Sequence, residues 1–165
     1  MPQAILALGS NVGNPKENLD RAIAALKSVG TVGEVAPYIV SKPEGYAYQD
    51  DFVNTVLTLQ TQLAPMPLLR ALKQLEKDLG RVPTFHNGPR VIDLDILFYE
   101  DQVIFEDADD YTLLIPHSRI AEREFVLKPL SYILPQFIHP KLKQPIYLLY
   151  RALMKKKGTP SCQIL

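Results

Sequence analysis

Two aspartates, Asp93 and Asp95, alternate with apolar residues in a run over residues 91–99 that reads as a strand. Successive side chains of a strand point to opposite faces, so these two carboxylates share one face. Neighbouring carboxylates repel each other unless a cation lies between them. Mg²⁺ typically takes one or two carboxylates and fills its coordination sphere with water and phosphate oxygens. The pair is therefore compatible with a magnesium site, although a bare Asp-x-Asp is more often an acidic pair on a solvent-facing strand.

Basic residues stand around this acidic pair in the sequence. Carboxylates that hold a metal and guanidiniums that grip phosphate oxygens are what a metal–polyphosphate site requires. Surface salt bridging is the alternative explanation, because exposed ion pairs are common and contribute little. Arg90 has the opposite strand parity from Asp93, so it joins such a site only if the strand begins or bulges after it. The basic residues are Arg81, Arg90, His117, Arg119 and Arg123.

Two other segments are candidates for ligand contacts. The turn Gly-Ser-Asn-Val-Gly at 9–13 lies between a strand and a helix, where backbone amides can bind an anion. It lacks the lysine and the spacing of a P-loop, so a tight connection is the preferred interpretation. Phe52, Asn54 and Phe125 suit a slot for a flat heterocycle, whereas two phenylalanines alone are more typical of a core.

The elements that must position these residues follow from hydrophobic periodicity, β-branched and aromatic enrichment, and capping residues. Asn14 and Pro15 are typical of a helix start, and Gly30 and Gly80 are typical of helix ends. The predicted strands are residues 4–8, 31–40, 52–63 and 91–99, and the predicted helices run from residue 15 to before Gly30 and from residue 65 or 67 to Gly80.

This order of elements predicts an α+β fold. Strand, helix, strand, strand, helix, strand is the order of a ferredoxin-like antiparallel sheet with packed helices, here with additional C-terminal elements. Downstream, we expect residues 102–106 to form a hairpin with the strand 91–99. A short helix toward Phe125 is expected from Ser118, with breaks at Pro129 and Pro135.

Composition indicates one soluble domain. Lys plus Arg and Asp plus Glu are equal at 18 each, so no global field attracts nucleic acid or membranes. A single cysteine, no signal peptide and no long apolar run predict a cytoplasmic protein. We expect residues 1–154 to form the domain and residues 155–165 a flexible tail. The Cys-Gln-Ile-Leu sequence at 162–165 fits a prenylation box only loosely, so an unmodified tail is preferred.

The run from His86 to Leu97 resembles the signature of the 6-hydroxymethyl-dihydropterin pyrophosphokinase (HPPK) family of folate biosynthesis. Other segments match that family in order between about residue 4 and residue 135, and together they are specific. The resemblance implies an enzyme that transfers diphosphate from ATP to the hydroxymethyl group of 6-hydroxymethyl-7,8-dihydropterin and releases AMP. The further matching segments are Leu8-Gly9-Ser10-Asn11, Phe52-Val53-Asn54, Glu76, Gly80-Arg81, Pro116-His117 and Arg123-Glu124-Phe125.

The resemblance also implies a role for each matching residue. Asp93 and Asp95 match carboxylates that hold two Mg²⁺ ions, and with Arg81 and Arg90 they form the expected catalytic set. The expected ATP-binding residues are Lys73, Glu76, Arg81, Arg90, Ile96, His117 and Arg123. The expected pterin-binding residues are Ser41, Pro43, Glu44, Phe52, Asn54 and Phe125.

Some positions depart from the family pattern. They bear on how the loops close over the site and on the affinity for nucleotide. The loop over residues 81–90 is about one residue shorter than in the family. Asn87 stands where some members carry a tryptophan. Pro83 and Thr84 replace residues that are often basic, and Ser118 stands where a tyrosine is common.

The expected mechanism is in-line attack of the pterin hydroxymethyl oxygen on the β-phosphorus of ATP, aided mainly by positioning and electrostatics. No residue is nominated as a general base. The loops 41–51 and 81–89 are expected lids that exclude water. We expect a monomer with ATP and the pterin as its partners and no nucleic-acid or membrane partner. The alternatives are a non-catalytic ferredoxin-like module that binds a small ligand and an Asp-x-Asp glycosyltransferase.

Overall fold

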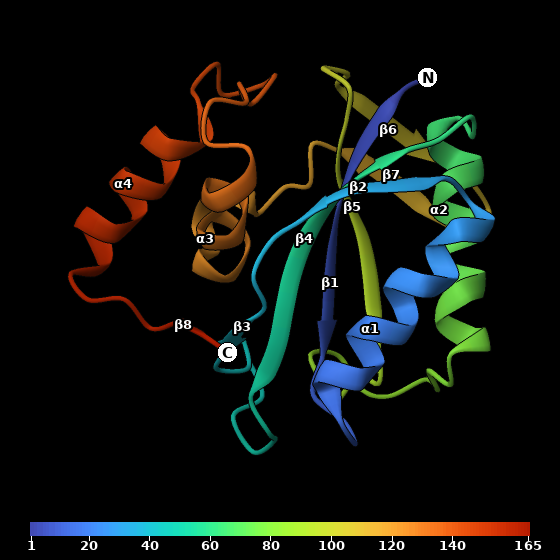
Figure 1. Cartoon of the computed structure of the whole chain (residues 1–165), viewed down its shortest axis with the longest axis horizontal. Helices are drawn as coiled ribbons and strands as arrows, with labels where there is room; N and C mark the ends of the chain where they lie inside the picture. The colour runs from blue at the N-terminus through green and yellow to red at the C-terminus, as the bar shows by residue number, and fades with distance from the viewer.

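The computed structural model describes all 165 residues as one α+β unit. Helices and strands alternate through the first hundred residues, and helices dominate afterwards (Figure 1). Short 3₁₀ turns lie at Leu26–Ser28 and Ile120–Glu122. The strands are β1 Gln3–Ser10, β2 Thr31–Val35, β3 Ile39–Ser41, β4 Phe52–Gln60, β5 Asp93–Tyr99, β6 Ile104–Asp107, β7 Thr112–Ile115 and β8 Gln163–Ile164, and the helices are α1 Pro15–Ala25, α2 Pro65–Asp78, α3 Glu124–Ile133 and α4 Ile146–Lys157.

The main sheet has the order β5-β1-β4-β3-β8, and β2 also pairs with β4. All of its pairings are antiparallel. The predicted strand 31–40 is interrupted after Val35, before Pro37, whose nitrogen cannot donate to a ladder. If β2 and β3 are counted as one interrupted strand, the order is that of a ferredoxin-like sheet, so the predicted fold class is confirmed.

The helix starts follow from local chemistry. Asn14 caps α1, because its side-chain oxygen accepts a hydrogen bond from the amide of Glu17 at 3.2 Å. Pro15 and Pro65 occupy the first positions of α1 and α2, where a missing N–H costs nothing. These two helices cover one face of the sheet, and α3 and α4 cover the other (Figure 1).

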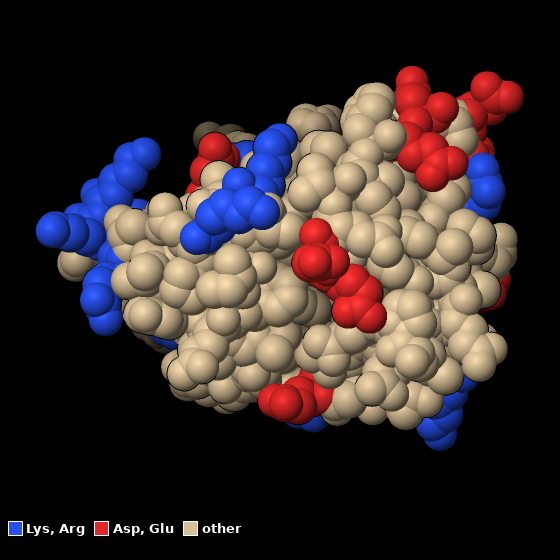
Figure 2. All heavy atoms as spheres, turned by 90° about the horizontal axis from the view of Figure 1, so that it is seen from above, with Lys and Arg blue, Asp and Glu red and all other residues tan.

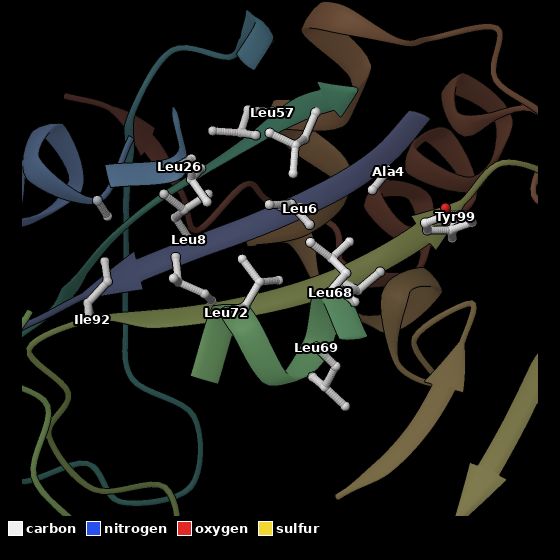
Figure 3. Packing of buried hydrophobic residues seen from close by; sticks show 14 of the residues in the cluster. Ala4, Leu6, Leu8, Leu26, Leu57, Leu68, Leu69, Leu72, Ile92 and Tyr99 are labelled. Carbon is white, nitrogen blue, oxygen red and sulfur yellow. The ribbon is translucent and has the colours of Figure 1, made fainter. Parts of the chain in front are cut away.

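Both faces of the sheet are therefore buried, which explains why β1 is apolar at nearly every position. Leu6 and Leu8 belong to the core between the sheet and the helices α1 and α2, where Leu72 of α2 packs against them (Figure 3). Ile5 belongs to the second core, with Leu127 of α3. The two cores hold the sheet rigidly between two helical layers.

Two predictions about the later elements are wrong. Residues 102–106 do not form a hairpin with β5; instead β6 pairs with β7, and Ile104 lies opposite Ile115. Ile115 is fully buried, so β7 is anchored in the main core and provides β6 with a partner. Pro129 lies inside α3 rather than ending it. The buried side chains around it, Val126 and Leu130, hold that helix against the sheet.

The structure also differs from the flexible tail expected for residues 155–165. Helix α4 continues to Lys157, the side chain of Cys162 is buried, and β8 pairs with β3 at the edge of the sheet (Figure 1). The buried carboxylate of Glu124 accepts hydrogen bonds from this segment and so supplies the physical reason for its order.

The surface agrees with the equal numbers of acidic and basic residues. In the view of Figure 2, charged side chains form small separate groups with wide uncharged areas between them. None of the helices is both long enough and apolar enough to span a bilayer.

Candidate active site

A cavity opens at the edge of the sheet where β1 ends and where β4 and β5 begin. The first turn of α3 and the loops 42–51 and 81–92 complete its walls. Ser41 at the end of β3 adds to these walls, so residues from distant parts of the chain meet in one hollow. Nine of the predicted site residues line it: Ser41, Glu44, Phe52, Asn54, Arg90, Asp93, Asp95, Arg123 and Phe125.

Asp93 and Asp95 both line this cavity, as the strand parity predicted. Their side chains are 36% and 35% exposed, whereas Leu94 between them is fully buried on the opposite face. Ile96 has the parity of Leu94, so its side chain lies in the hydrophobic core and not in the cavity. Its predicted role in ATP binding stays a prediction.

Electrostatics around the aspartates suit a cation. Burial and the negative charge of Asp95 raise the pKa of Asp93, and the positive charges of Lys73, Arg81 and Arg90 only partly offset this. Lys73 Nζ lies 3.5 Å from a carboxylate oxygen of Asp95, and Arg81 Nη2 lies 3.9 Å from one of Asp93. No third histidine, cysteine or carboxylate completes a metal-binding group. Two carboxylates alone fit Mg²⁺ that also takes phosphate and water, and they do not fit a cage made only of protein ligands.

Glu76 organises the cations beside this pair. Its side chain is 2% exposed, and its carboxylate accepts hydrogen bonds from Lys73 Nζ at 3.0 Å, Arg81 Nη1 at 2.6 Å and the amide of Leu94 at 2.6 Å. Burial would lower the pKa of Lys73, but the carboxylates of Asp95, Glu76 and Asp93 outweigh it and raise that pKa. Lys73 therefore remains an ammonium.

A second hollow lies on the other side of these cations. Arg90 lines both hollows and so connects them. The strand begins at Asp93, which satisfies the condition under which Arg90 joins the site. The second hollow is lined by Lys73, Glu76, Lys77, Arg81, Val82, Pro83, Thr84, Arg90 and Tyr111.

The aromatic slot forms with its amide held in place. Phe52, Asn54 and Phe125 all line the cavity. Asn54 Nδ2 donates to Ser41 Oγ at 2.6 Å, so one of its two N–H donors is occupied and the amide is fixed in orientation. A Cβ atom at Gly9 would lie 2.8 Å from Asn54 Oδ1 and 3.7 Å from the Phe52 ring. Glycine at this position therefore keeps the slot open.

Glu44 bridges two arginines of the site. It accepts a hydrogen bond from Arg123 Nη2 at 3.1 Å and from Arg119 Nη1 at 3.3 Å. The buried Nε of Arg123 has no partner. Pro43, which precedes Glu44, does not belong to the lining. The guanidinium of Arg123 is therefore available to a further anion in the cavity.

His117 stands close to these charges but outside the cavity lining. Burial and the positive charge of Arg123 lower its pKa, so the imidazole is neutral at pH 7. Its Nδ1 accepts a hydrogen bond from the amide of Arg119 at 3.3 Å. A neutral ring with one nitrogen used in this way can still donate from its other nitrogen.

Sequence reasoning missed Asn11, which ties the two loops together. Its side-chain nitrogen donates to Gln49 Oε1 and to the carbonyl of Asp50, each at 2.9 Å, and its oxygen accepts from the amide of Arg90 at 2.8 Å. Gln49 Nε2 donates in turn to the carbonyl of Asn87 at 2.7 Å. The only sequence signal was an asparagine that follows Gly-Ser, and that signal does not reveal a contact 38 residues away.

An aromatic contact adds to this connection between the loops. Tyr46 and Phe85 pack edge to face with ring centroids 4.8 Å apart. Gly45 has φ +75°, and a Cβ atom there would lie 2.5 Å from Asn87 Nδ2. The loops 42–51 and 81–92 thus meet over the cavity without the tryptophan that some family members place at Asn87.

Comparison with known proteins identifies what this site resembles. The family model described as 7,8-dihydro-6-hydroxymethylpterin-pyrophosphokinase (HPPK) matches residues 5–135. The 2-amino-4-hydroxy-6-hydroxymethyldihydropteridine pyrophosphokinase of Aquifex aeolicus is 38% identical over 146 residues, which are 88% of this chain and 89% of that protein. The enzyme of the same name from Pseudomonas aeruginosa is 40% identical over 82% of each chain.

Longer proteins match as well. The folic acid synthesis protein FOL1 of Dictyostelium discoideum is 44% identical over 83% of this chain, and the chain spans about a fifth of its length (20%). A solved structure of HPPK-DHPS from Plasmodium falciparum with pteroate superposes with a TM-score of 0.83 at 16% identity, over 99% of this chain and 47% of that one. That likeness bears on the fold, and it agrees with the ferredoxin-like sheet described above.

Proposed function

The chain belongs to the 7,8-dihydro-6-hydroxymethylpterin-pyrophosphokinase family, and from this premise we propose that it transfers the diphosphate of ATP to the hydroxymethyl group of 6-hydroxymethyl-7,8-dihydropterin and releases AMP. The observation that carries the proposal is one shared cavity. Its walls include both the paired carboxylates of Asp93 and Asp95 and the slot of Phe52, Asn54 and Phe125. Acceptor and phosphates would therefore meet at the start of β5.

The pterin ring lies in the slot between Phe52 and Phe125 in this proposal. The ring is flat, so it stacks on aromatic faces with little loss of side-chain freedom. Ser41 accepts from one N–H of Asn54 Nδ2 and fixes the amide, so the Oδ1 of Asn54 can accept from the amino group of the pterin and the second N–H of Nδ2 can donate to the ring. The Glu44 carboxylate, held by Arg123, limits the slot on the side of the phosphates.

Asp93 and Asp95 would hold two Mg²⁺ ions together with ATP. When bound, these ions neutralise charge on the phosphates and orient the attacking and leaving oxygens. The protein supplies two rigid carboxylates on adjacent same-face positions of β5, with Leu94 fixed in the core between them. Burial and the negative charge of Asp95 raise the pKa of Asp93, and a bound cation would favour the charged form of both carboxylates.

The cations of the chain bind and orient the polyphosphate. Arg90 lines both hollows, and Arg81 and Lys73 line the second hollow on the carboxylate of Glu76. Because Glu76 fixes both side chains before substrate arrives, little reorganisation remains for the reaction. Arg123 and the neutral His117 complete the nucleotide side.

The loops 42–51 and 81–92 exclude water from the reacting atoms. Asn11 joins both loops to the end of β1, next to the slot. Exclusion of water favours transfer to the pterin over hydrolysis of ATP. No side chain at the attacking oxygen stands out as a general base. The protein acts in the cytoplasm as a monomer in this proposal.

The test is AMP release from ATP and Mg²⁺, with and without the reduced pterin. We expect AMP only with the pterin, together with an equal amount of diphosphorylated pterin. ATP binding without AMP would instead favour a ligand-binding module. Turnover of a sugar nucleotide would favour the glycosyltransferase alternative.

A further inference from the structure

Residues 158–165 dock onto the start of α3 through a buried carboxylate. Glu124 accepts from Lys157 Nζ at 2.8 Å, from the amide and hydroxyl of Ser161 at 3.0 Å each, and from the amide of Cys162 at 2.9 Å. Its side chain is 2% exposed. Lys128 Nζ donates to the carbonyl of Cys162 at 2.7 Å and fastens the segment a second time.

A carboxylate this deeply buried is stable only when its partners are complete. Burial opposes the ionisation of Glu124, but Lys157 and the amides of Ser161 and Cys162 outweigh burial and lower its pKa to about 2. Glu124 is therefore charged at neutral pH. The segment that supplies most of its donors is held in a single position.

The same segment continues as a strand of the main sheet. β8 pairs antiparallel with β3, with Ile164 opposite Ile39 and Gln163 opposite Val40 (Figure 1). On its other side β3 pairs with β4, which carries Phe52 and Asn54 of the slot. A strand of three residues such as β3 gains its order from both neighbours.

Residues 158–165 attach to β3 and to the start of α3, and both of these elements are directly connected to residues of the slot. Ser41, the last residue of β3, orients the amide of Asn54. Glu124 directly precedes Phe125, which also lines the cavity, and directly follows Arg123. One segment outside the cavity thus holds two of its walls, from β3 and from α3.

We propose that residues 158–165 form a positioning strap for the pterin slot, with Glu124 as its anchoring residue. This inference rests on the proposed function for the identity of the ligand. It assigns the strap its main share in pterin affinity, because most of the nucleotide residues lie on α2, on β5 and in the loop before β5, and only Arg123 and His117 lie elsewhere. Glu124 touches neither substrate, so it is a positioning residue.

Two proline variants distinguish the loss of the pairing between β8 and β3 from a general destabilisation of the fold. Residues opposite each other in an antiparallel ladder alternate between bonded and non-bonded pairs. Leu165 donates its amide to the carbonyl of Tyr38, so the amide of Gln163 also faces β3, and the amide of Ile164 faces away. Gln163→Pro therefore removes a ladder hydrogen bond. Ile164→Pro imposes the same ring without that loss and is the matched control.

The measurement is calorimetric titration of 6-hydroxymethyl-7,8-dihydropterin into protein with Mg²⁺ and the α,β-methylene analogue of ATP. For Gln163→Pro we expect Kd for the pterin to rise about tenfold, the equivalent of one hydrogen bond of about 1.4 kcal/mol. Kd for the ATP analogue should remain within about twofold. Ile164→Pro should match the wild type in both. Hydrogen exchange of the amides in β3 should accelerate only in Gln163→Pro.

A second pair of variants keeps the proposal testable if Gln163→Pro fails to fold. Glu124→Gln retains the volume of the side chain but loses the charge that holds Lys157, and Glu122→Gln changes an exposed neighbour that pairs only with Arg119. Pterin affinity should fall in the first variant alone. Equal pterin affinity in folded strap variants and wild type, or an equal loss for the ATP analogue, would overturn the strap. No pterin binding by the wild-type protein would overturn the proposed function and the strap together.

Discussion

Asp93 and Asp95 face one cavity, and burial together with the negative charge of Asp95 raises the pKa of Asp93 in spite of the cations around the pair. Two partly buried carboxylates side by side are unfavourable unless a cation binds between them, and perturbed pairs of this kind are common at functional sites. Glu76 shows the opposite arrangement, because its buried carboxylate is fully paired with Lys73, Arg81 and a backbone amide. The buried carboxylate of Glu76 thus supports neighbouring side chains, whereas Asp93 and Asp95 remain the proposed metal ligands.

At the residue scale, we expect Asp95→Asn to lower kcat for AMP release by about 10²-fold or more. Loss of one charge partner in a site closed to water typically has an effect of this size. Asp101→Asn, in the exposed turn after β5, is the control and should leave kcat unchanged. The measurement is pterin-dependent AMP release over a range of Mg²⁺ concentrations. Near wild-type turnover by Asp95→Asn would remove the metal assignment.

The alternation of side chains along β5 shows which features of the site could be predicted from the sequence alone. Period two placed Asp93 and Asp95 on one face correctly, and the condition set for Arg90 was met because the strand begins at Asp93. The same rule, applied to Ile96, places its side chain in the core, where the structure has it. The contacts of Asn11 with Gln49 and Arg90 follow no period, so sequence reasoning had no means of predicting them.

At the element scale, the loops 42–51 and 81–92 are joined to each other and to β1 rather than standing free. Their contacts are polar at Asn11 and aromatic at Tyr46 and Phe85. Strand β8 was missed because it is two residues long and depends on a distant carboxylate, Glu124. The hairpin predicted between residues 102–106 and the strand 91–99 was also wrong because of a more distant contact. β6 pairs with β7, which is held in place by the buried side chain of Ile115.

Asn11→Ala should weaken the attachment of the loops 42–51 and 81–92 to the end of β1. Three side-chain hydrogen bonds are lost, so we expect KM for the pterin to rise about tenfold and pterin-independent ATP hydrolysis to increase as water enters. Asn14→Ala is the matched control, because it removes the cap of α1 and lowers stability by about 1 kcal/mol without touching either loop. Steady-state kinetics of AMP release for both variants would check this. Identical KM values for the pterin in Asn11→Ala and wild type would show that the attachment of the loops does not contribute to pterin binding.

The Glu124 carboxylate should make stability depend on pH in acid. Its pKa falls from the usual 4.5 to about 2 on folding, so its stabilisation is complete above about pH 4.5 and is lost as pH falls toward 2. The difference of 2.5 units corresponds to about 3 kcal/mol. We expect Glu124→Gln to be less stable than wild type by up to that amount at pH 7. The gap should close near pH 2 in urea unfolding followed by circular dichroism.

Glu122→Gln provides the reference for that comparison, since its side chain is 66% exposed. Its unfolding free energy should track the wild type within about 0.5 kcal/mol at neutral pH. A constant gap between Glu124→Gln and wild type from pH 7 to pH 2 would contradict the ionised state of Glu124. The contacts of the strap would then need another explanation.

At the scale of the whole molecule, a single sheet joins two hydrophobic cores. Leu72 packs in the core beneath α1 and α2, and Leu127 packs in the core beneath α3 and α4. Because β1 contributes side chains to both, neither helical layer can leave without exposing the sheet. The extra C-terminal helices are thus part of the unit that holds the site, which supports a single domain that extends beyond residue 154.

We expect Leu72→Ala and Leu127→Ala each to lower the free energy of unfolding by about 2–5 kcal/mol. Since the cores share one sheet, both variants should shift the same single transition in urea. The measurement is unfolding followed by circular dichroism and by tyrosine fluorescence, with coincidence of the two curves as the criterion. Two separated transitions in either variant would show that the helical layers unfold independently.

Transfer of two phosphates as one group is the central claim, and ATP labelled at its β-phosphorus tests it most directly. The protein is incubated with this ATP, Mg²⁺ and 6-hydroxymethyl-7,8-dihydropterin, and the products are separated. We expect the label to appear in the pterin and the AMP to carry none. Label retained in ADP would mean transfer of a single phosphate, and label in free phosphate or diphosphate would mean hydrolysis. Either result would rule out diphosphate transfer to the pterin.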